Sequence, residues 1–200
     1  MRINSQTTTQ CYLIAVLAAV ACGKAADKNP AAATGRPTDV RKLTINLDGQ
    51  TVEASLPKKW RLLPQQSDES AGLVAFVNSQ STLERSESMF LDGSRAVQIP
   101  SSLEEARARS IADDDCQSTG ACTELARSDA EDVTSVIVKK PTAVFVRSWR
   151  RTPGGRAIRC GAEASALGAL SLPGWITDPR EAERAGREIE ALCRAVKAVP

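Results

Sequence analysis

Regular alternation of apolar and polar residues marks the first predicted element of the chain. The alternation runs through residues 43–47 and resumes through 52–56, with Asp48-Gly49 between the two runs. An Asp-Gly pair in this setting is typical of a two-residue type I′ turn. Pairing Leu47 with Gln50 puts the apolar side chains of both runs on one face, so the turn and the alternation agree on one register. The pattern therefore predicts a β-hairpin.

Further strands follow from the apolar pattern. The continuous apolar run at 72–78 indicates a strand that is buried on both faces. Residues 88–99 indicate a strand pair or an irregular strand around Asp92-Gly93. A Pro153-Gly154-Gly155 turn separates two late strands. The remaining strands are expected at 133–138, 143–149 and 156–164.

Two helices carry start signals. Ser102 and Glu105 have the spacing of a capping box, and Arg109 follows Glu105 at a distance that allows an ion pair on the helix surface. Asp178 and Pro179 supply an N-cap and a first helical residue for a second helix, which we expect over Pro179–Ala198. Its apolar residues recur at helical spacing and form one stripe: Ala182, Ala185, Ile189, Leu192, Cys193 and Val196.

The order of these elements predicts the fold class. A hairpin, strands, a helix, further strands and a last helix are typical of an α+β domain. We expect an antiparallel β-sheet packed by the mid-chain helix and by the C-terminal amphipathic helix. Residues 40–200 would form this single domain, since about 160 residues are enough for one proper core.

The N-terminal segment has the pattern of a signal peptide, which we assign to residues 1–21. Its apolar run, Tyr12–Ala21, has about half the roughly twenty residues that a membrane-spanning helix needs. Two interpretations remain for its end. In one, Ala19-x-Ala21 is the cleavage site of a plain secretory signal. In the other, the segment resembles a bacterial lipobox and Cys22 becomes lipidated, although Ala19 stands where leucine is commonest.

The number of cysteines favours lipidation of Cys22. Cleavage before Cys22 leaves five cysteines, and an odd number implies one exposed free thiol in an exported protein. Lipidation uses Cys22 and leaves four. Gly23, in place of aspartate after the cysteine, resembles the signal for sorting to the outer membrane. Residues 22–39 show no apolar periodicity and are expected to form a flexible tether.

Four cysteines allow three pairings. We expect Cys116–Cys122, which closes a short loop, and Cys160–Cys193, which ties the last helix to a late strand. The alternatives are a metal site or a redox pair. Zinc sites usually use CxxC or histidine spacings, which are missing here, and the gap between Cys116 and Cys122 is too long for a CxxC redox motif.

Composition narrows the chemistry. The chain has no histidine, and its one tyrosine, Tyr12, is removed with the signal peptide. Histidine-based acid–base catalysis, nucleophilic triads and most transition-metal sites are therefore not available. No glycine-rich phosphate loop is present, and no cofactor is expected. An enzyme of this composition would rely on carboxylates, so the alternative function is a small periplasmic hydrolase using Glu163 or Asp132.

Two charged clusters were considered as sites. Asp113-Asp114-Asp115, with Glu124, offers oxygen ligands for calcium, but the EF-hand spacing is absent and a solvated loop is the favoured interpretation. A basic cluster surrounds the turn at Pro153-Gly154-Gly155. An aromatic residue beside arginines has the composition of an interface hot spot, so we expect a partner to bind at this hairpin tip. The cluster consists of Arg147, Arg150, Arg151, Arg156 and Arg159 with Trp149, and the residues expected to bind the partner are Arg147, Trp149, Arg150 and Arg151. The alternative is a solvated basic face.

One motif and the order of the elements resemble a known family. Leu56-Pro57 and Trp60 follow the opening hairpin, and the mid-chain helix, late antiparallel strands and terminal helix come after them. This arrangement resembles the Mog1/PsbP-like fold, which includes bacterial lipoproteins. The resemblance covers residues 40–199. It implies no shared catalytic residues, and the two cysteine pairs are not general to the family.

These observations lead to one expected function. We expect an exported, lipid-anchored, non-catalytic binding module at the outer membrane or the periplasmic face of the bacterial cell envelope. Its partner would be another envelope or secreted protein. The net charge of the chain is +2, and 25 basic and 24 acidic residues remain once Arg2 is removed with the signal, so we do not expect nucleic acid to bind.

Overall fold

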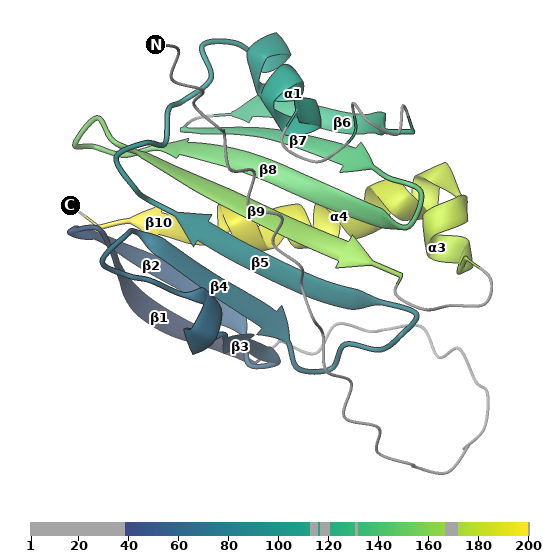
Figure 1. Cartoon of the computed structure of the whole chain (residues 1–200), viewed down its shortest axis with the longest axis horizontal. Helices are drawn as coiled ribbons and strands as arrows, with labels where there is room; N and C mark the ends of the chain where they lie inside the picture. The colour runs from purple at the N-terminus through teal and green to yellow at the C-terminus, as the bar shows by residue number, and fades with distance from the viewer. Residues whose placement is uncertain (1–38, 113–115, 117–120, 131, 167–171, 200) are drawn as a thin grey trace, which may run out of the picture. The chain divides into compact units, whose positions relative to one another are not determined.

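Two antiparallel sheets form the framework of the computed structural model (Figure 1). The structure describes residues 39–112, 116, 121–130, 132–166 and 172–199, all within the second of two units, 1–36 and 37–200. The small sheet has the order β1 (Val40–Leu47), β2 (Gln50–Pro57), β10 (Val196–Ala198). The large sheet has the order β3 (Trp60–Leu62), β4 (Leu73–Asn78), β5 (Ser86–Asp92), β9 (Ala157–Ser165), β8 (Ala143–Arg151), β7 (Val133–Lys139), β6 (Thr123–Ala130).

Three helices and a short 3-10 turn complete the described residues. They are η1 (Pro64–Gln66), α1 (Leu103–Ala112), α3 (Gly174–Thr177) and α4 (Pro179–Arg194). None of these helices is long and apolar enough to cross a membrane. The α+β class, with mainly antiparallel strands and few helices, is as predicted.

The opening hairpin has the predicted register. Leu47 pairs with Gln50, and Ile45 pairs with Val52. Asp48 and Gly49 both have positive φ, 51° and 78°, as a type I′ turn requires. The predicted start of α1 is also confirmed in large part. The backbone N–H of Glu105 donates to Ser102 Oγ at 3.1 Å, while the Glu105 carboxylate accepts from Ser101 rather than from Ser102. Hydrogen bonds from Ser101, and then from Arg109, lower the pKa of Glu105 to about 2.

Two predicted elements differ in extent. Of the two alternatives for residues 88–99, the strand pair is wrong: a single strand, β5, ends at Asp92 and the chain continues without strand structure to α1. Gly93 is used for close packing instead of a turn: a Cβ at this position would lie 2.7 Å from Leu47 Cβ. The last helix ends at Arg194, and Val196 belongs to β10, where it pairs with Ala54 of the small sheet. Edge pairing with β2 thus replaces the last helical turn.

The two faces of the large sheet are covered differently. Successive residues of a strand point to opposite faces. One face packs against α4 and the small sheet in the main core, which includes Leu47, Phe76, Ile137 and Ile189. The other face packs against α1 in a second cluster with Val136, Phe145 and Trp149, but only over the β6–β7–β8 part of the sheet.

Candidate binding face

The alternation of strand β8 separates the predicted partner-binding residues. Arg147 and Trp149 point to the α1 side of the sheet and are 9% and 2% exposed. Arg150 points to the α4 side, where it forms an ion pair with Asp132 and donates to the backbone carbonyl of Arg194 at 3.1 Å. Arg151 is exposed at the end of the strand. The expectation that these four residues form one exposed hairpin tip is wrong, since all four lie within β8 and three of them are largely covered.

A different group of residues comes together on the α1 side of the sheet. Pairing of β5 with β9 and of β9 with β8 aligns Phe90, Gly161 and Arg147 in one row across three strands. The rows on either side contain Ser88, Glu163 and Phe145, and Asp92, Arg159 and Trp149. We call this surface of β5, β9 and β8 the open face, because α4 and the small sheet both lie on the opposite side of the sheet and α1 covers this side mainly over β7 and β6 (Figure 1).

Cations and aromatic rings alternate across the open face. The guanidinium of Arg159 lies 5.6 Å from the Phe90 ring, and that of Arg147 lies 5.2 Å from the same ring. Arg147 is also 5.3 Å from the Phe145 ring, and Lys140 Nζ is 4.9 Å from it. All four distances are within the cation–π range. We call this series, Arg159–Phe90–Arg147–Phe145–Lys140, the cation–π ladder.

Gly161 makes the centre of the ladder possible. A Cβ at Gly161 would lie 2.2 Å from the Phe90 ring and 2.7 Å from Arg147 Nη1. The ring and the guanidinium therefore lie directly on the backbone of β9, where no other residue leaves enough room. Charges on the face favour anions: Lys140, Arg147, Arg151 and Arg159 stand against Asp92 and Glu163.

A pocket of about 240 Å³ lies at one end of the ladder. Arg159 and Trp149 contribute from the sheet, Arg109 contributes from α1, and Val97 and Gln98 contribute from the connection between β5 and α1. Arg159 donates to Asp92 Oδ2 at 3.0 Å, and Arg109 donates to the Gln98 carbonyl at 2.7 Å. The predicted neighbours Trp149 and arginine do meet, but at this pocket and with different arginines.

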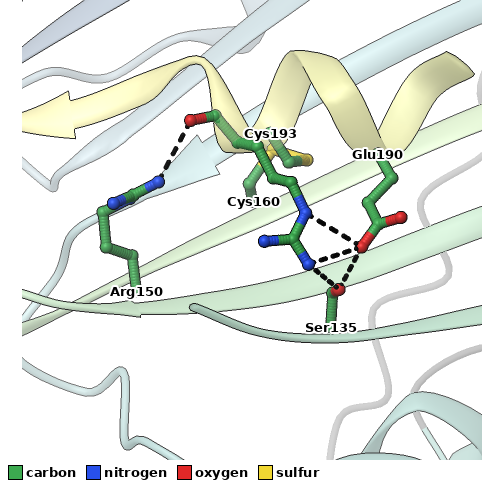
Figure 2. The surroundings of a disulfide bond; sticks show 6 residues. Ser135, Arg150, Cys160, Glu190 and Cys193 are labelled. Carbon is green, nitrogen blue, oxygen red and sulfur yellow. Dashed lines mark hydrogen bonds and ion pairs between the residues drawn. A yellow bond between two sulfur atoms is a disulfide. The ribbon is translucent and has the colours of Figure 1, made fainter. Parts of the chain in front are cut away.

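On the opposite side of the sheet, hydrogen bonds and a disulfide join α4 to the strands. Glu190 of α4 is 4% exposed and accepts hydrogen bonds from Ser135 and Arg194 (Figure 2). It also accepts one from Arg187. Burial raises the pKa of Glu190, but these hydrogen bonds outweigh burial and lower it below the usual value. Beside them the Cys160–Cys193 disulfide joins β9 to α4, and Cys116–Cys122 is the second bond, so both expected pairings are present (Figure 2).

The carboxylates considered for a hydrolase do not meet. Asp132 pairs with Arg150 on the α4 side, whereas Glu163 belongs to the row of Phe145 on the open face. The candidate calcium ligands Asp113-Asp114-Asp115 lie outside the described residues, and Glu124 is paired with Arg107 and Arg127. Within the described ranges, no three acidic or cysteine side chains group as metal ligands do. Cys22 also lies outside them.

Sequence reasoning missed Phe90 and Gly161, and it placed Arg159 only in the basic cluster around the late turn. A signal for Gly161 and Arg159 was present: between 157 and 165, Ile158, Cys160 and Ala162 alternate with Arg159, Gly161 and Glu163. This alternation separates a core face from a polar one, and a glycine inside a strand indicates close approach. The place of Phe90 depends on pairing between strands that are far apart in sequence. Of the other tryptophans, Trp60 is buried, and Trp175 donates to the Glu84 carbonyl at 3.0 Å at the core edge.

Comparison with solved structures identifies the fold as Mog1-like. A mutant of the protein Mog1 superposes with a TM-score of 0.56 at 10% sequence identity, over 80% of this chain and 96% of that one. The Saccharomyces cerevisiae Ran-binding protein Mog1p gives a TM-score of 0.54 at 11% identity, with the same coverage. No protein-family model and no curated protein matches the sequence. The likeness therefore concerns the fold alone.

Proposed function

We propose that this protein is a non-catalytic binding module, tethered to the membrane of a bacterial cell envelope, that holds a partner protein on its open face. The observation that carries the proposal is the cation–π ladder. It spreads three cations and two aromatic rings across neighbouring strands, on the side of the sheet opposite the main core. Phe145 is buried in the second cluster and Arg147 is 9% exposed. The half-buried members, Phe90, Arg159 and Lys140, are therefore the ones that a partner can reach.

The ladder has the properties of a recognition surface. Arginine and aromatic residues dominate the binding energy of protein interfaces. A guanidinium stacked on a ring keeps its N–H groups at the edge, where they match the geometry of a carboxylate. Stacking also fixes the long arginine side chain before binding, which lowers the entropy that a partner must overcome, since each immobilised flexible side chain costs about 0.5–1.5 kcal/mol.

The comparison supports a protein as the partner class. The yeast neighbour is described as a Ran-binding protein, so the same fold serves protein recognition in that molecule. We infer the same class of activity here and a different partner, because this chain has the features of an exported protein.

The tether determines where the module acts. We propose that residues 1–21 direct export, that lipidated Cys22 anchors the chain, and that 22–39 link it to the domain. Wild-type protein expressed in a bacterial host should partition into detergent with the membranes. Cys22→Ala should release it or block its processing. A soluble wild-type protein that begins at Cys22 would contradict the anchor without affecting the binding face.

Blocking the open face tests the binding proposal. Ser88 is exposed in the row beside Phe90, so Ser88→Trp adds bulk to the face without removing a ladder contact. Thr44→Trp, at an exposed position of β1 in the small sheet, is the matched control. Affinity capture from solubilised membranes should recover a protein with wild type and with the control, and lose it with Ser88→Trp. Equal recovery with all three would refute the open face as the binding surface.

A further inference from the structure

Hydrogen bonds hold the walls of the pocket beside Trp149 in place. Its outer wall is the connection between β5 and α1, which Arg109 holds in place through the hydrogen bond to the Gln98 carbonyl. Ser101, at the end of the same connection, donates to Glu105 from its backbone N–H at 2.7 Å and from its hydroxyl at 2.6 Å. The walls are therefore fixed to the first turns of α1.

Side chains that carry hydrogen-bond donors line this pocket from separate elements. Arg109 reaches it from α1 and Arg159 from β9, and Trp149 of β8 lines it while only 2% exposed. A guanidinium has five N–H donors and the indole has one, and neither group accepts a hydrogen bond. An occupant that supplies two acceptor oxygens and a negative charge suits this set, because charge-assisted hydrogen bonds to arginine are the strong ones.

One carboxylate already lines the pocket, and its acceptors are in use. Asp92 accepts from Arg159 at 3.0 Å and from the backbone N–H of Ser94 at 3.0 Å. The lining thus contains two guanidinium groups and one carboxylate, and each guanidinium is already paired: Arg159 with Asp92, and Arg109 with Glu105, which does not line the pocket. The guanidinium donors, rather than an excess of charge, favour an anion over a cation here.

We propose that this pocket receives the carboxylate of an acidic side chain, aspartate or glutamate, from the protein that docks on the open face. The inference rests on the proposed function and specifies the chemistry of the partner. The apolar walls from Val97 and Trp149 fit the methylene stem of such a side chain, while Arg109 and Arg159 bind its oxygens. Continuity with the ladder, through Arg159, places the rest of an acidic segment across Phe90 and Arg147.

The three tryptophans of the chain provide a direct reporter. The full chain, labelled with ¹⁵N-tryptophan and kept in detergent, gives three indole signals, and Trp149→Phe identifies one of them. N-acetylglutamate N-methylamide is titrated at constant ionic strength, with the glutamine analogue as the uncharged probe. We expect the Trp149 signal alone to shift and to saturate with the glutamate probe at millimolar concentration.

Variants locate the effect. Arg109→Gln and Arg159→Gln should each weaken the glutamate probe about tenfold or more, since a hydrogen bond to a charged group is lost. Arg107→Gln is the matched control, because Arg107 lies on the same helix and pairs with Glu124, outside the pocket. Its titration should be that of wild type, and an equal loss in this control would refute the assignment to the pocket.

Other outcomes separate this inference from the proposed function. A Trp149 signal that stays fixed, or that moves equally with the glutamine analogue, refutes the carboxylate pocket. A shift with glycerophosphate and none with the glutamate probe refutes it in favour of a lipid head group. If the pocket does not bind the glutamate probe while Ser88→Trp still abolishes capture of the partner, the carboxylate pocket is refuted and the proposed function is retained. If the pocket binds the probe and capture of the partner is unchanged by Ser88→Trp, the proposed function is refuted.

Discussion

The two faces of the large sheet use the same strands for opposite purposes. On the α4 side, Arg150 and Glu190 are joined to neighbouring elements, and a disulfide closes the layer (Figure 2). On the open face, the guanidinium groups of Arg147 and Arg159 lie 5.2 and 5.6 Å from the Phe90 ring, which packs over Gly161. Adjacent residues such as Ser148 and Trp149 serve different sides. Charged residues of one strand can therefore have different roles. Those that point to the α4 side stabilise the fold, and those that point to the open face contribute to a surface.

The disulfides give the largest expected difference between regions. Replacing Cys160 and Cys193 together by alanine should lower the free energy of unfolding by about 4 kcal/mol, and replacing Cys116 and Cys122 by about 2 kcal/mol, because the longer loop loses more chain entropy. Urea denaturation measures both. Equal losses would show that the α4 side owes no special stability to its bond.

Glu190 should give the next largest effect. Glu190→Gln removes the charge that Ser135, Arg187 and Arg194 surround, and should cost about 2 kcal/mol of unfolding free energy. Glu183→Gln, on the exposed surface of the same helix, should cost less than about 0.5 kcal/mol. A small effect at Glu190 would mean that burial opposes the hydrogen bonds more than we infer.

The same residue predicts a pH dependence. The pKa of Glu190 is lower in the folded state than its usual value. Its contribution to stability is therefore present above the unfolded pKa, near 4.3, and is lost as the pH falls through the lower folded pKa. Urea unfolding between pH 7 and pH 3 should show a shallower loss of stability in Glu190→Gln than in wild type. Parallel curves would contradict this assignment.

Gly161 tests the construction of the open face. Gly161→Ala places a methyl group against the Phe90 ring and the Arg147 guanidinium, and such overpacking should cost about 1–3 kcal/mol. Gly154→Ala is the matched control, since a Cβ there meets nothing within 4 Å. Thermal unfolding compares them. If alanine is tolerated equally at both positions, the ladder does not lie on the strand backbone as described.

The smallest effect concerns the ladder itself. A double-mutant cycle with Phe90→Leu and Arg147→Gln should give a coupling free energy of about 0.5–2 kcal/mol, which is the range for a cation–π pair that is partly shielded from water. The cycle removes the other contacts of each residue from the result. A coupling of zero would show that ring and guanidinium are neighbours without attraction.

Features that depend on residues close together in the sequence could be predicted, and features that depend on long-range strand pairing could not. The hairpin at Asp48-Gly49, the N-cap at Asp178 and the two cysteine pairs depend on neighbours or on simple loop arguments, and all agree with the structure. The ladder depends on the pairing of β5 with β9, whose paired residues are 67 to 79 positions apart in the chain. It also depends on which set of alternating strand residues faces the core. Alternation in β8 separates Arg147 from Arg150 but does not show which is covered. β10 likewise forms only because it pairs with the free edge of β2 in the folded small sheet, which the sequence of 196–198 does not indicate.

A crosslinker at Ser88 tests the central claim, that the open face contacts the partner, most directly. A photoreactive benzoylphenylalanine is introduced at Ser88 in one variant and at Thr44 in another, in intact cells that make the lipid-anchored chain. Both positions are exposed on strands of different sheets. After irradiation, the account predicts a defined adduct with one envelope protein from position 88 and none from position 44. An adduct from position 44 alone would contradict it.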